Sequence, residues 1–160
     1  LQVTYKVMCP TGEISRDGMD FWKPSGWKTS DNNDYKANVY DKGHMAPAAA
    51  FNCFDKQTLK ETFNYLNCAL QHQSLNRGPW KELERFERDL SKVFETVNVS
   101  ITIHFDNEPE FVEGGAQIPS GFTKIIVAGE HKWSFHFENI NLKGRDWSDF
   151  QIPNQRPDFD

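Results

Sequence analysis

The strongest constraint on the fold is a strict alternation of apolar and polar residues over positions 97–105. The apolar members of this pattern are Val97, Val99, Ile101, Ile103 and Phe105, and every residue between them is polar. A period of two predicts a strand with one buried and one exposed face, which is typical of antiparallel sheets.

Three further segments are predicted to join this strand. Residues 3–8 have the composition of a short strand. Residues 122–128 and 132–137 are expected to form a hairpin about Gly129-Glu130-His131, with Trp133, Phe135 and Phe137 on one face. The sequence therefore predicts an antiparallel sheet.

Two segments have helical periodicity. Residues 55–66 place Leu59, Phe63 and Leu66 on one side, after a capping residue at Asp55 or Thr58. A second helix is expected from Pro79, which suits a first helical turn, to about Glu95. Its apolar positions are Leu83, Phe86, Leu90, Val93 and Phe94. Together with the sheet, these helices predict an α+β fold with two main helices.

The connections also carry information. Residues 15–40 are polar, and we interpret them as a long surface loop held by Phe21, Trp22 and Trp27. Residues 107–119 are interpreted as a second loop, and the segment after Phe150 as an extended polar tail.

Composition excludes several classes of protein. The 160 residues suffice for one domain with its own core, so we expect residues 1–160 to form a single domain. A net charge of −5 argues against broad coating of nucleic acid, but not against a locally basic nuclease site. No apolar run approaches the ~20 residues of a membrane helix. Cys9, Cys53 and Cys68 lack zinc-ribbon spacing. We interpret them as three reduced thiols, with one disulfide and one free thiol as the alternative.

The segment from Asp41 to Ala48 holds the first candidate for chemistry. His44 follows Gly43, and we interpret this glycine as a sharp turn, with Asp41 orienting the turn or the imidazole. A histidine with an adjusted pKa is the usual general base near neutral pH. An ordinary loop histidine beside a glycine turn is the alternative.

The second candidate segment begins at Asn76. Its amide oxygen suits Mg²⁺, which keeps most of its waters, and the alternative is that Asn76 caps the helix that follows. Trp80, Glu84 and Arg88 recur at helical spacing on one face, where Glu84 would hold a metal-bound water and Arg88 a phosphate. A surface ion pair between Glu84 and Arg88 is the alternative.

Other polar residues are less informative. Asn67 and Gln71 flank residues 68–70, where buried amides either brace a site or satisfy loop backbone. No metal-like spacing relates the remaining histidines, which are His72, His104, His131 and His136.

Together, these motifs resemble the DNA/RNA non-specific endonuclease family, which carries the ββα-metal (His-Me) finger and includes endonuclease G-like mitochondrial nucleases and secreted bacterial nucleases. Residues 41–48 resemble the family's Asp-Arg-Gly-His motif with its following Leu/Met-x-Pro-Ala, and residues 62–71 resemble its Thr-Phe-x-x-x-Asn-x-x-Pro-Gln segment. Asn76 through Trp80 to Glu84 resembles the family's Asn-x-x-x-Trp-x-x-x-Glu helix start. Looser similarity extends to residues 118–124 and 152–154.

The resemblance implies a role for each candidate. His44 would deprotonate the attacking water, and Asn76 would be the direct protein ligand of Mg²⁺, with Mn²⁺ as an alternative ion. Glu84 would hold one of the metal's waters. Arg88 and Lys42 would steady the phosphate and the leaving oxygen.

The sequence departs from the family pattern in several places. Lys42 stands where the family usually has Arg, so the bidentate grip on phosphate is lost. Leu70 replaces the usual Pro, and the family's Thr-Gly-Pro-type strand end is absent after Ser100. The N-terminal segment has no clear match for the family's upstream arginine, for which Arg16 is a poor candidate.

The resemblance therefore implies a Mg²⁺-dependent, sugar-non-specific endonuclease that cuts DNA and RNA to 5′-phosphorylated ends. The residues behind this hypothesis are His44, Asn67, Asn76, Glu84 and Arg88. The main alternative is a nuclease-fold subunit of a larger assembly with weak or no activity, and a third is a protein-binding module that uses the aromatic residues of the 15–40 loop. A homodimer, and a mitochondrial or secreted location with mitochondria slightly favoured, complete the expectations.

Overall fold

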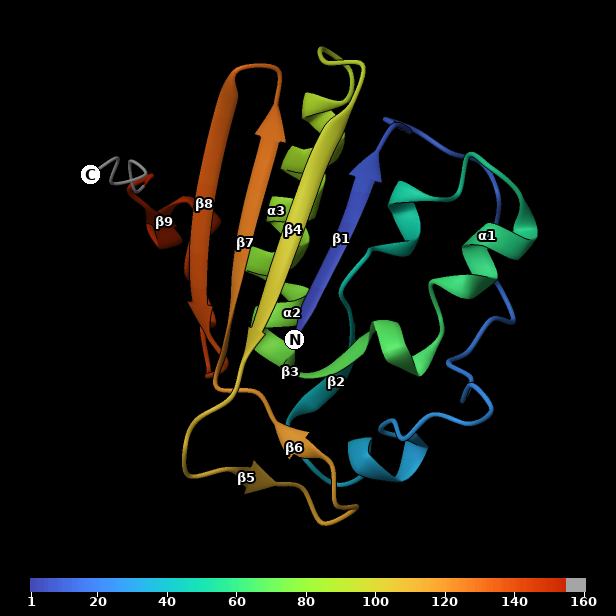
Figure 1. The fold of residues 1–160 in the computed structure, drawn as a ribbon, viewed down its shortest axis with the longest axis vertical. Coiled ribbons are helices and arrows are strands. Elements are labelled where there is room, and N and C mark those ends of the chain that lie inside the picture. The colour runs from blue at the N-terminus through green and yellow to red at the C-terminus, as the bar shows by residue number, and fades with distance from the viewer. Residues whose placement is uncertain (155–160) are drawn as a thin grey trace.

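An antiparallel sheet forms the centre of the molecule in the computed structural model, which describes residues 1–154 (Figure 1). The sheet has the strand order β1-β4-β7-β8-β9, and every neighbouring pair in it is antiparallel. Its members are β1 (Gln2–Val7), β4 (Val97–His104), β7 (Gly121–Ala128), β8 (His131–Glu138) and β9 (Gln151–Ile152). The predicted sheet is confirmed, and β9 adds an edge strand that the sequence did not indicate.

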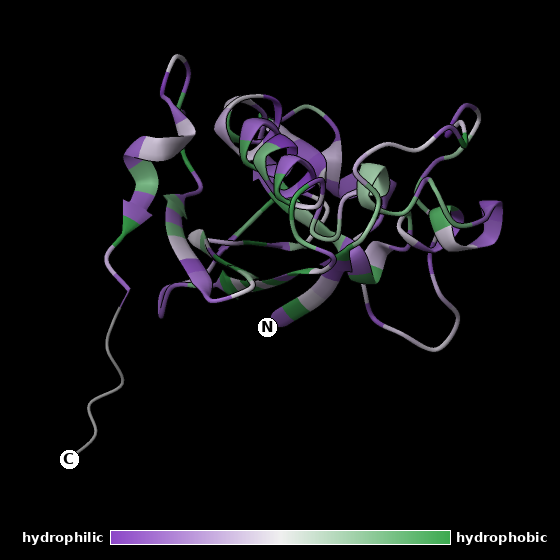
Figure 2. Cartoon of the chain, turned by 90° about the horizontal axis from the view of Figure 1, so that it is seen from above, coloured by the Kyte–Doolittle hydropathy of each residue, from purple (hydrophilic) through white to green (hydrophobic). Residues whose placement is uncertain are grey.

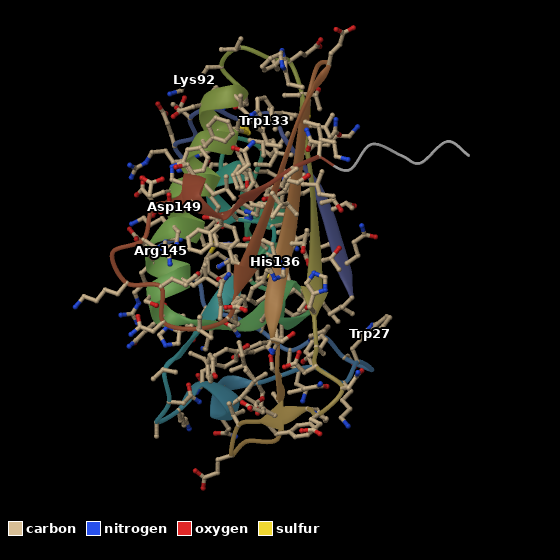
Figure 3. The ribbon with its side chains drawn as sticks, turned by 90° about the vertical axis from the view of Figure 1, so that its left-hand side faces the viewer. Trp27, Lys92, Trp133, His136, Arg145 and Asp149 are labelled. Carbon is tan, nitrogen blue, oxygen red and sulfur yellow. A yellow bond between two sulfur atoms is a disulfide. The ribbon has the colours of Figure 1, made fainter. Side chains whose placement is uncertain are left out.

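The alternation in β4 sets the two faces of the sheet. Val97, Val99, Ile101 and Ile103 are buried, whereas Phe105 lies beyond the strand and is 40% exposed. On β8, Phe135 and Phe137 are fully buried, and Trp133 packs edge-on against Phe86. Figure 3 shows Trp133 and His136 on β8. Successive side chains of a strand point to opposite faces, and these two residues are three positions apart, so they lie on opposite faces of the sheet.

Helix α3 (Pro79–Leu90) covers the buried face of this sheet (Figure 2). Pro79 occupies the first turn, and Trp80 and Leu83 point into the core. The helix ends at Leu90, earlier than the predicted Glu95. Val93 is 77% exposed, so its predicted place on the buried side of the helix is wrong.

Helix α1 (Lys56–Glu61) is also shorter than predicted. The Asp55 carboxylate caps it by accepting from the Thr58 backbone N–H at 2.6 Å. The backbones of Phe63 and Tyr65 then pair with Trp22, which draws the chain out of the helix. Leu66 is therefore 47% exposed rather than on the buried side of a longer helix.

Two short antiparallel pairs were not predicted, and the second of them lies in the segment 107–119 that we interpret as a loop. The strands are β2 (Tyr40–His44) with β3 (Cys68–His72), and β5 (Glu110–Phe111) with β6 (Gln117–Ile118). Helix α2 (Gln73–Arg77) follows β3 and leads directly into α3. Short 3₁₀ helices complete the fold, and they are η1 (Asn32–Tyr35), η2 (Ala48–Ala50), η3 (Tyr65–Asn67) and η4 (Trp147–Phe150).

The cysteines and the aromatic residues of the 15–40 segment differ from expectation. Cys9 and Cys53 form a disulfide and Cys68 is free, so the interpretation as three reduced thiols is wrong and its alternative holds. Phe21 and Trp22 pack against a small cluster with Leu59 and Phe63, which removes them as a binding surface. Trp27 is 63% exposed and lies at the edge of the molecule (Figure 3).

Within residues 1–154, no helix is long and apolar enough to cross a membrane. The predicted tail after Phe150 follows η4 and begins with β9, and residues 155–160 lie outside the described part of the chain.

Candidate active site

A cavity of about 560 Å³ lies where β2, α2 and α3 meet the N-terminal loop. Its walls include five cationic side chains and two acidic ones, Asp17 and Glu84, so this region is positive in a protein of net charge −5. The cations are Arg16, Lys42, Arg77, Lys81 and Arg88. Such a local field attracts anions such as phosphates despite the acidic balance of the whole chain.

The structure brings together residues that are far apart in the sequence. Lys42, His44, Asn76, Glu84 and Arg88, all predicted site residues, line this cavity. They come from β2, α2 and α3, and the ββα arrangement of this part of the fold consists of the pair β2 and β3 followed by these helices. The remaining predicted residue, Asn67, is not among the lining residues.

His44 is presented by an extended strand rather than by a turn. Gly43 lies inside β2, and its neighbour in the sequence, His44, pairs in register with Cys68. A Cβ atom on Gly43 would come within 2.6 Å of the Gln71 Oε1 atom. The predicted sharp turn is therefore wrong, and glycine is required here because β3 approaches so closely.

The imidazole of His44 sits between two aromatic rings. The Phe21 ring lies 4.6 Å from it and the Phe63 ring 4.7 Å, centroid to centroid. Burial, reinforced by the charge of Arg16, lowers the pKa of His44 to about 4. Its Nε2 atom is buried and has no hydrogen-bond partner among the described residues. A neutral histidine at a cavity wall is equipped to accept a proton.

Asp41 orients Asn76 through a fixed network. The Asn76 Nδ2 atom donates to the Asp41 carboxylate at 2.9 Å, and Arg77 holds the same carboxylate with two bonds of 2.7 and 2.8 Å. Burial opposes ionisation of Asp41, but these bonds keep its pKa below the usual value. With Nδ2 engaged, Oδ1 is the amide atom of Asn76 that remains available to the cavity. Asn76 lies within α2, and the cap of α3 is Gly78, so the helix-cap alternative for Asn76 is wrong.

Glu84 and Arg88 reach the cavity from α3, whereas Trp80 does not. Trp80 is 1% exposed and packs against Phe122 and Phe137 in the core. Because each step of four residues drifts by about 40° around a helix, Trp80 and Arg88 do not share one face. Burial raises the pKa of Glu84 to about 7, against the opposing charge of Lys124.

Lys42 lines the cavity while pairing with Asp20. Its Nζ atom lies 3.2 Å from the Asp20 Oδ1 atom, and the Asp20 side chain is 78% exposed. Burial works against the charge of Lys42, but the bond to Asp20 raises its pKa above the ordinary value. Lys42 is thus protonated at neutral pH, and the carboxylate with which it pairs, that of Asp20, is exposed to solvent.

Asn67 braces the loop that follows His44. Its Oδ1 atom accepts from the Ala46 N–H at 2.8 Å, and its Nδ2 atom donates to the carbonyl groups of Ala46 and Thr62 at 2.8 and 2.9 Å. Both amide hydrogens are used, so this side chain holds the chain between His44 and η2 in place. Asn67 therefore acts on the site through the backbone.

Arg16 also lines the cavity, although the sequence indicates it only poorly as a match for the family's upstream arginine. The segment that carries Arg16 is held beside the cavity by two hydrogen bonds with Asn52. The Asn52 side-chain amide donates to the carbonyl group of Gly12, and the Asn52 carbonyl group accepts from the backbone N–H of Ile14. The Cys9–Cys53 disulfide ties the same two segments together. No local motif marks Arg16, and only the pairing of the two cysteines would have indicated that its segment lies beside η2.

The donor set fits a hard cation that keeps most of its waters. No group of three or more His, Cys, Asp or Glu side chains in residues 1–154 is arranged to hold a metal ion. The cavity instead offers the Asn76 amide oxygen and the Glu84 carboxylate. One direct oxygen ligand and a nearby carboxylate suit Mg²⁺, which loses its waters reluctantly.

Comparisons with known proteins agree with this geometry. The family model described as DNA/RNA non-specific endonuclease matches residues 19–157. The chain is similar to endonuclease G, mitochondrial, of Bos taurus, with 31% identity over 91 residues. It is also similar to nuclease EXOG, mitochondrial, of Xenopus laevis, with 39% identity over 110 residues. These alignments cover 55% and 62% of this chain but only 30% of each relative.

A solved structure shares the fold of the chain. A chain in the crystal structure of the EndoG/EndoGI complex, described as the mechanism of EndoG inhibition, superposes with a TM-score of 0.80 and 25% identity. The superposition covers 95% of this chain and 72% of that chain. The cavity therefore lies in a fold that is shared with a ββα-metal protein over nearly the whole sequence.

Proposed function

The chain belongs to the DNA/RNA non-specific endonuclease family, and from this premise we propose that it is a Mg²⁺-dependent endonuclease that hydrolyses phosphodiester bonds of both DNA and RNA. The observation that carries the proposal is the convergence of His44, Asn76, Glu84 and Arg88 on one positively charged cavity. A base, a hard oxygen ligand, a carboxylate and a phosphate-binding cation are the groups that such hydrolysis requires.

His44 acts as the general base. Its imidazole is neutral at pH 7 because its pKa is about 4, and its buried Nε2 atom is unpartnered among the described residues. The imidazole accepts a proton from a water molecule whose oxygen attacks phosphorus. The bond from phosphorus to the 3′ oxygen breaks and this oxygen takes a proton from solvent, which leaves a 5′-phosphate on one fragment and a 3′-hydroxyl on the other.

Asn76 and Glu84 would hold the metal. The Asn76 amide, oriented by Asp41, would contribute its oxygen directly, and the Glu84 carboxylate would accept hydrogen bonds from the waters that the ion retains. A bound Mg²⁺ relieves negative charge at the scissile phosphate and at the leaving oxygen. Mn²⁺, another ion that prefers oxygen ligands, is the alternative.

The cations of the cavity bind the substrate backbone. Arg88 and Lys42, together with Arg16, provide positive charge for the phosphate oxygens that do not contact the metal. Phosphate contacts carry no base or sugar information, which supports action on both DNA and RNA. Asn67 is a positioning residue, because it fixes the backbone beside His44.

Cleavage of supercoiled plasmid and of single-stranded RNA, with Mg²⁺ and with EDTA, tests this function. We expect metal-dependent hydrolysis by the parent chain and at least a 100-fold loss in His44→Ala. His131→Ala is the control, because His131 is exposed on β8 and lies outside the cavity. Equal rates for His44→Ala and the parent would show that His44 is not the base.

A second candidate function is that of a nuclease-fold subunit with weak or no activity. The ion pair between Lys42 and Asp20 favours it, because this pair engages a cation that the reaction would use. Co-purification in a stable complex, without hydrolysis at high protein concentration, would support this alternative over the enzyme.

The compartment and the assembly are part of the proposal. The names of the bovine and Xenopus relatives support a mitochondrial location. The Cys9–Cys53 disulfide is typical of an oxidising environment, which keeps secretion as the second candidate. We further propose that residues 1–160 act as a single domain and that the chain forms a homodimer, which sedimentation of the purified chain would test.

A further inference from the structure

The cations that line the cavity differ in whether a carboxylate already holds them. Lys42 and Arg77 each form an ion pair, at 3.2 and 2.7 Å. The other three cations, Arg16, Lys81 and Arg88, form no ion pair with any carboxylate of residues 1–154. Arg16 and Arg88 contact phosphate in the proposed function. Lys81 is then the unpaired cation of the described cavity wall that has no assigned role.

Lys81 lies on the same face of α3 as Arg88. Seven residues make about two helical turns, so the two positions are about 20° apart around the axis and about 10.5 Å apart along it. Glu84 lies between them along the axis, and all three side chains line the cavity. Trp80 and Leu83 are buried in the core and anchor this part of the helix. A rigid element therefore fixes the spacing of the two cations.

The place of Lys81 on the helix gives no stabilising reason for its charge. It is the third residue of α3, and the positive N-terminal end of the helix dipole disfavours a cation in the first turn. The adjacent carboxylate, that of Glu82, accepts a hydrogen bond from Arg85 at 3.0 Å. The Lys81 side chain is exposed. Its ammonium is therefore available to an anionic ligand at the cavity wall.

We propose that Lys81 forms a second phosphate subsite, in which its ammonium binds a non-scissile phosphate of the strand whose scissile phosphate lies at Arg88. The strand then follows α3 from Arg88 past Glu84 to Lys81. The inference rests on the proposed function, because that function places the scissile phosphate at Arg88.

The spacing of the two cations suits a nucleic-acid backbone. Consecutive phosphates of one strand in B-DNA rise by about 3.4 Å each, so about 10.5 Å along the helix corresponds to a few nucleotides. A lysine ammonium is a compact charge on a flexible stem and contacts phosphate without a fixed geometry. Such a contact carries no base information, so the subsite serves DNA and RNA alike. A dinucleoside monophosphate has only the scissile phosphate and does not reach Lys81.

The direct test is the salt dependence of binding. Fluorescence anisotropy of a labelled oligothymidylate measures binding to the full chain in EDTA, where metal-dependent cleavage is blocked. Each phosphate contact on a single strand contributes about 0.7 to the slope of log K against log salt concentration. Lys81→Gln should therefore bind more weakly than the parent and reduce the magnitude of this slope by about 0.7. Lys81→Arg keeps the charge and should remain close to the parent.

Arg85→Gln is the matched control. It removes one positive charge from the same helix, but Arg85 is not among the residues that line the cavity. Its salt slope should equal that of the parent. An unchanged slope in Lys81→Gln would overturn the proposal, and so would an equal fall in Arg85→Gln, which would show that only the total charge matters. Failure of the parent to bind the oligothymidylate at low salt would overturn it as well.

Activity provides an independent readout. With Mg²⁺ and an oligothymidylate substrate, Lys81→Gln should raise KM several-fold and change kcat little. On a dinucleoside monophosphate the variant and the parent should cleave at the same rate, because the only phosphate there is the scissile one. An equal loss on both substrates would contradict the subsite. If the parent chain does not cleave nucleic acid, the proposed function fails, but the salt slope in EDTA still decides the role of Lys81.

Discussion

His44 and Glu84 face the same cavity, and burial moves their pKa values in opposite directions. Burial disfavours the charged form of each group, so the pKa of His44 falls to about 4 and that of Glu84 rises to about 7. A neutral imidazole and a carboxylate that ionises near neutrality therefore coexist in one site. This separation is typical of active sites in which two titratable groups have different tasks.

The pKa of Glu84 predicts both the pH dependence of cleavage and a conflict between activity and stability. If Glu84 must be ionised, kcat/KM should rise with pH through about 7, and Glu84→Gln should lose most activity at every pH. In the unfolded chain Glu84 ionises near 4.5, so the folded state is increasingly disfavoured as pH rises from about 4.5 to about 7. Glu84→Gln lacks this penalty.

Thermal unfolding at two pH values checks the stability part of this prediction. Relative to the parent, Glu84→Gln should have a higher Tm at pH 8 and a similar Tm at pH 4.5. Glu82→Gln is a matched control, because Glu82 is a more exposed carboxylate on the same helix, paired with Arg85 at its surface. A Glu84→Gln variant that is destabilised at pH 8 would show that the carboxylate is stabilising in the folded chain.

At the scale of elements, the long periodic segments were predictable and the short site-forming strands were not. The alternation in β4 and the hairpin of β7 and β8 follow from period-two patterns, and α3 follows from Pro79 and its apolar positions. Strands β2 and β3 carry residues such as Lys42 and Gln71 that show no clean alternation. Their pairing depends on tertiary contacts, including the close approach of Gly43 to β3.

The candidate site was predictable where a motif marked it. His44, Asn76, Glu84 and Arg88 lie in segments with recognisable spacing, and all four line the cavity. Arg16 was not predictable, because its place depends on the disulfide and on hydrogen bonds of Asn52 with residues distant in the sequence. The buried ion pair between Lys124 and Glu87 was not predictable either, because the periodicity of a strand does not indicate that a lysine at a core position has a partner on α3.

The disulfide links the segment of Arg16 to the segment that follows His44, and its removal should affect both stability and substrate binding. Cys53→Ser removes a covalent link between two residues that are 44 positions apart in the sequence. We expect the free energy of unfolding to fall by about 2–4 kcal/mol. Because Arg16 would be held less firmly, KM should rise several-fold while kcat changes less.

Urea unfolding and steady-state kinetics of Cys53→Ser, with and without a reducing agent, measure these effects. The parent should acquire the properties of the variant on reduction, and the variant should not respond. Cys68→Ser is the control, because Cys68 is the free cysteine. An unchanged KM in Cys53→Ser would show that the disulfide is not needed to hold Arg16 in position for substrate binding.

At the scale of the whole molecule, the distribution of charge matters more than its sum. The chain has a net charge of −5, yet cations outnumber carboxylates around the cavity. An acidic surface limits unspecific association with nucleic acid, while a positive cleft concentrates phosphate at the reacting groups. The buried face of the sheet supports this arrangement, because α3 lies on it (Figure 1). From this position α3 contributes Glu84 and Arg88 to the cavity.

The central claim is that the His44 imidazole accepts the proton of the attacking water, and chemical rescue tests it most directly. His44→Ala leaves a space between Phe21 and Phe63 in which a small base would fit. Added imidazole should restore Mg²⁺-dependent plasmid cleavage by this variant at least tenfold, with a dependence on the neutral form of the base, and should not accelerate the parent. Failure of every small base to restore a correctly folded His44→Ala variant, or an equal acceleration of the parent, would contradict the account.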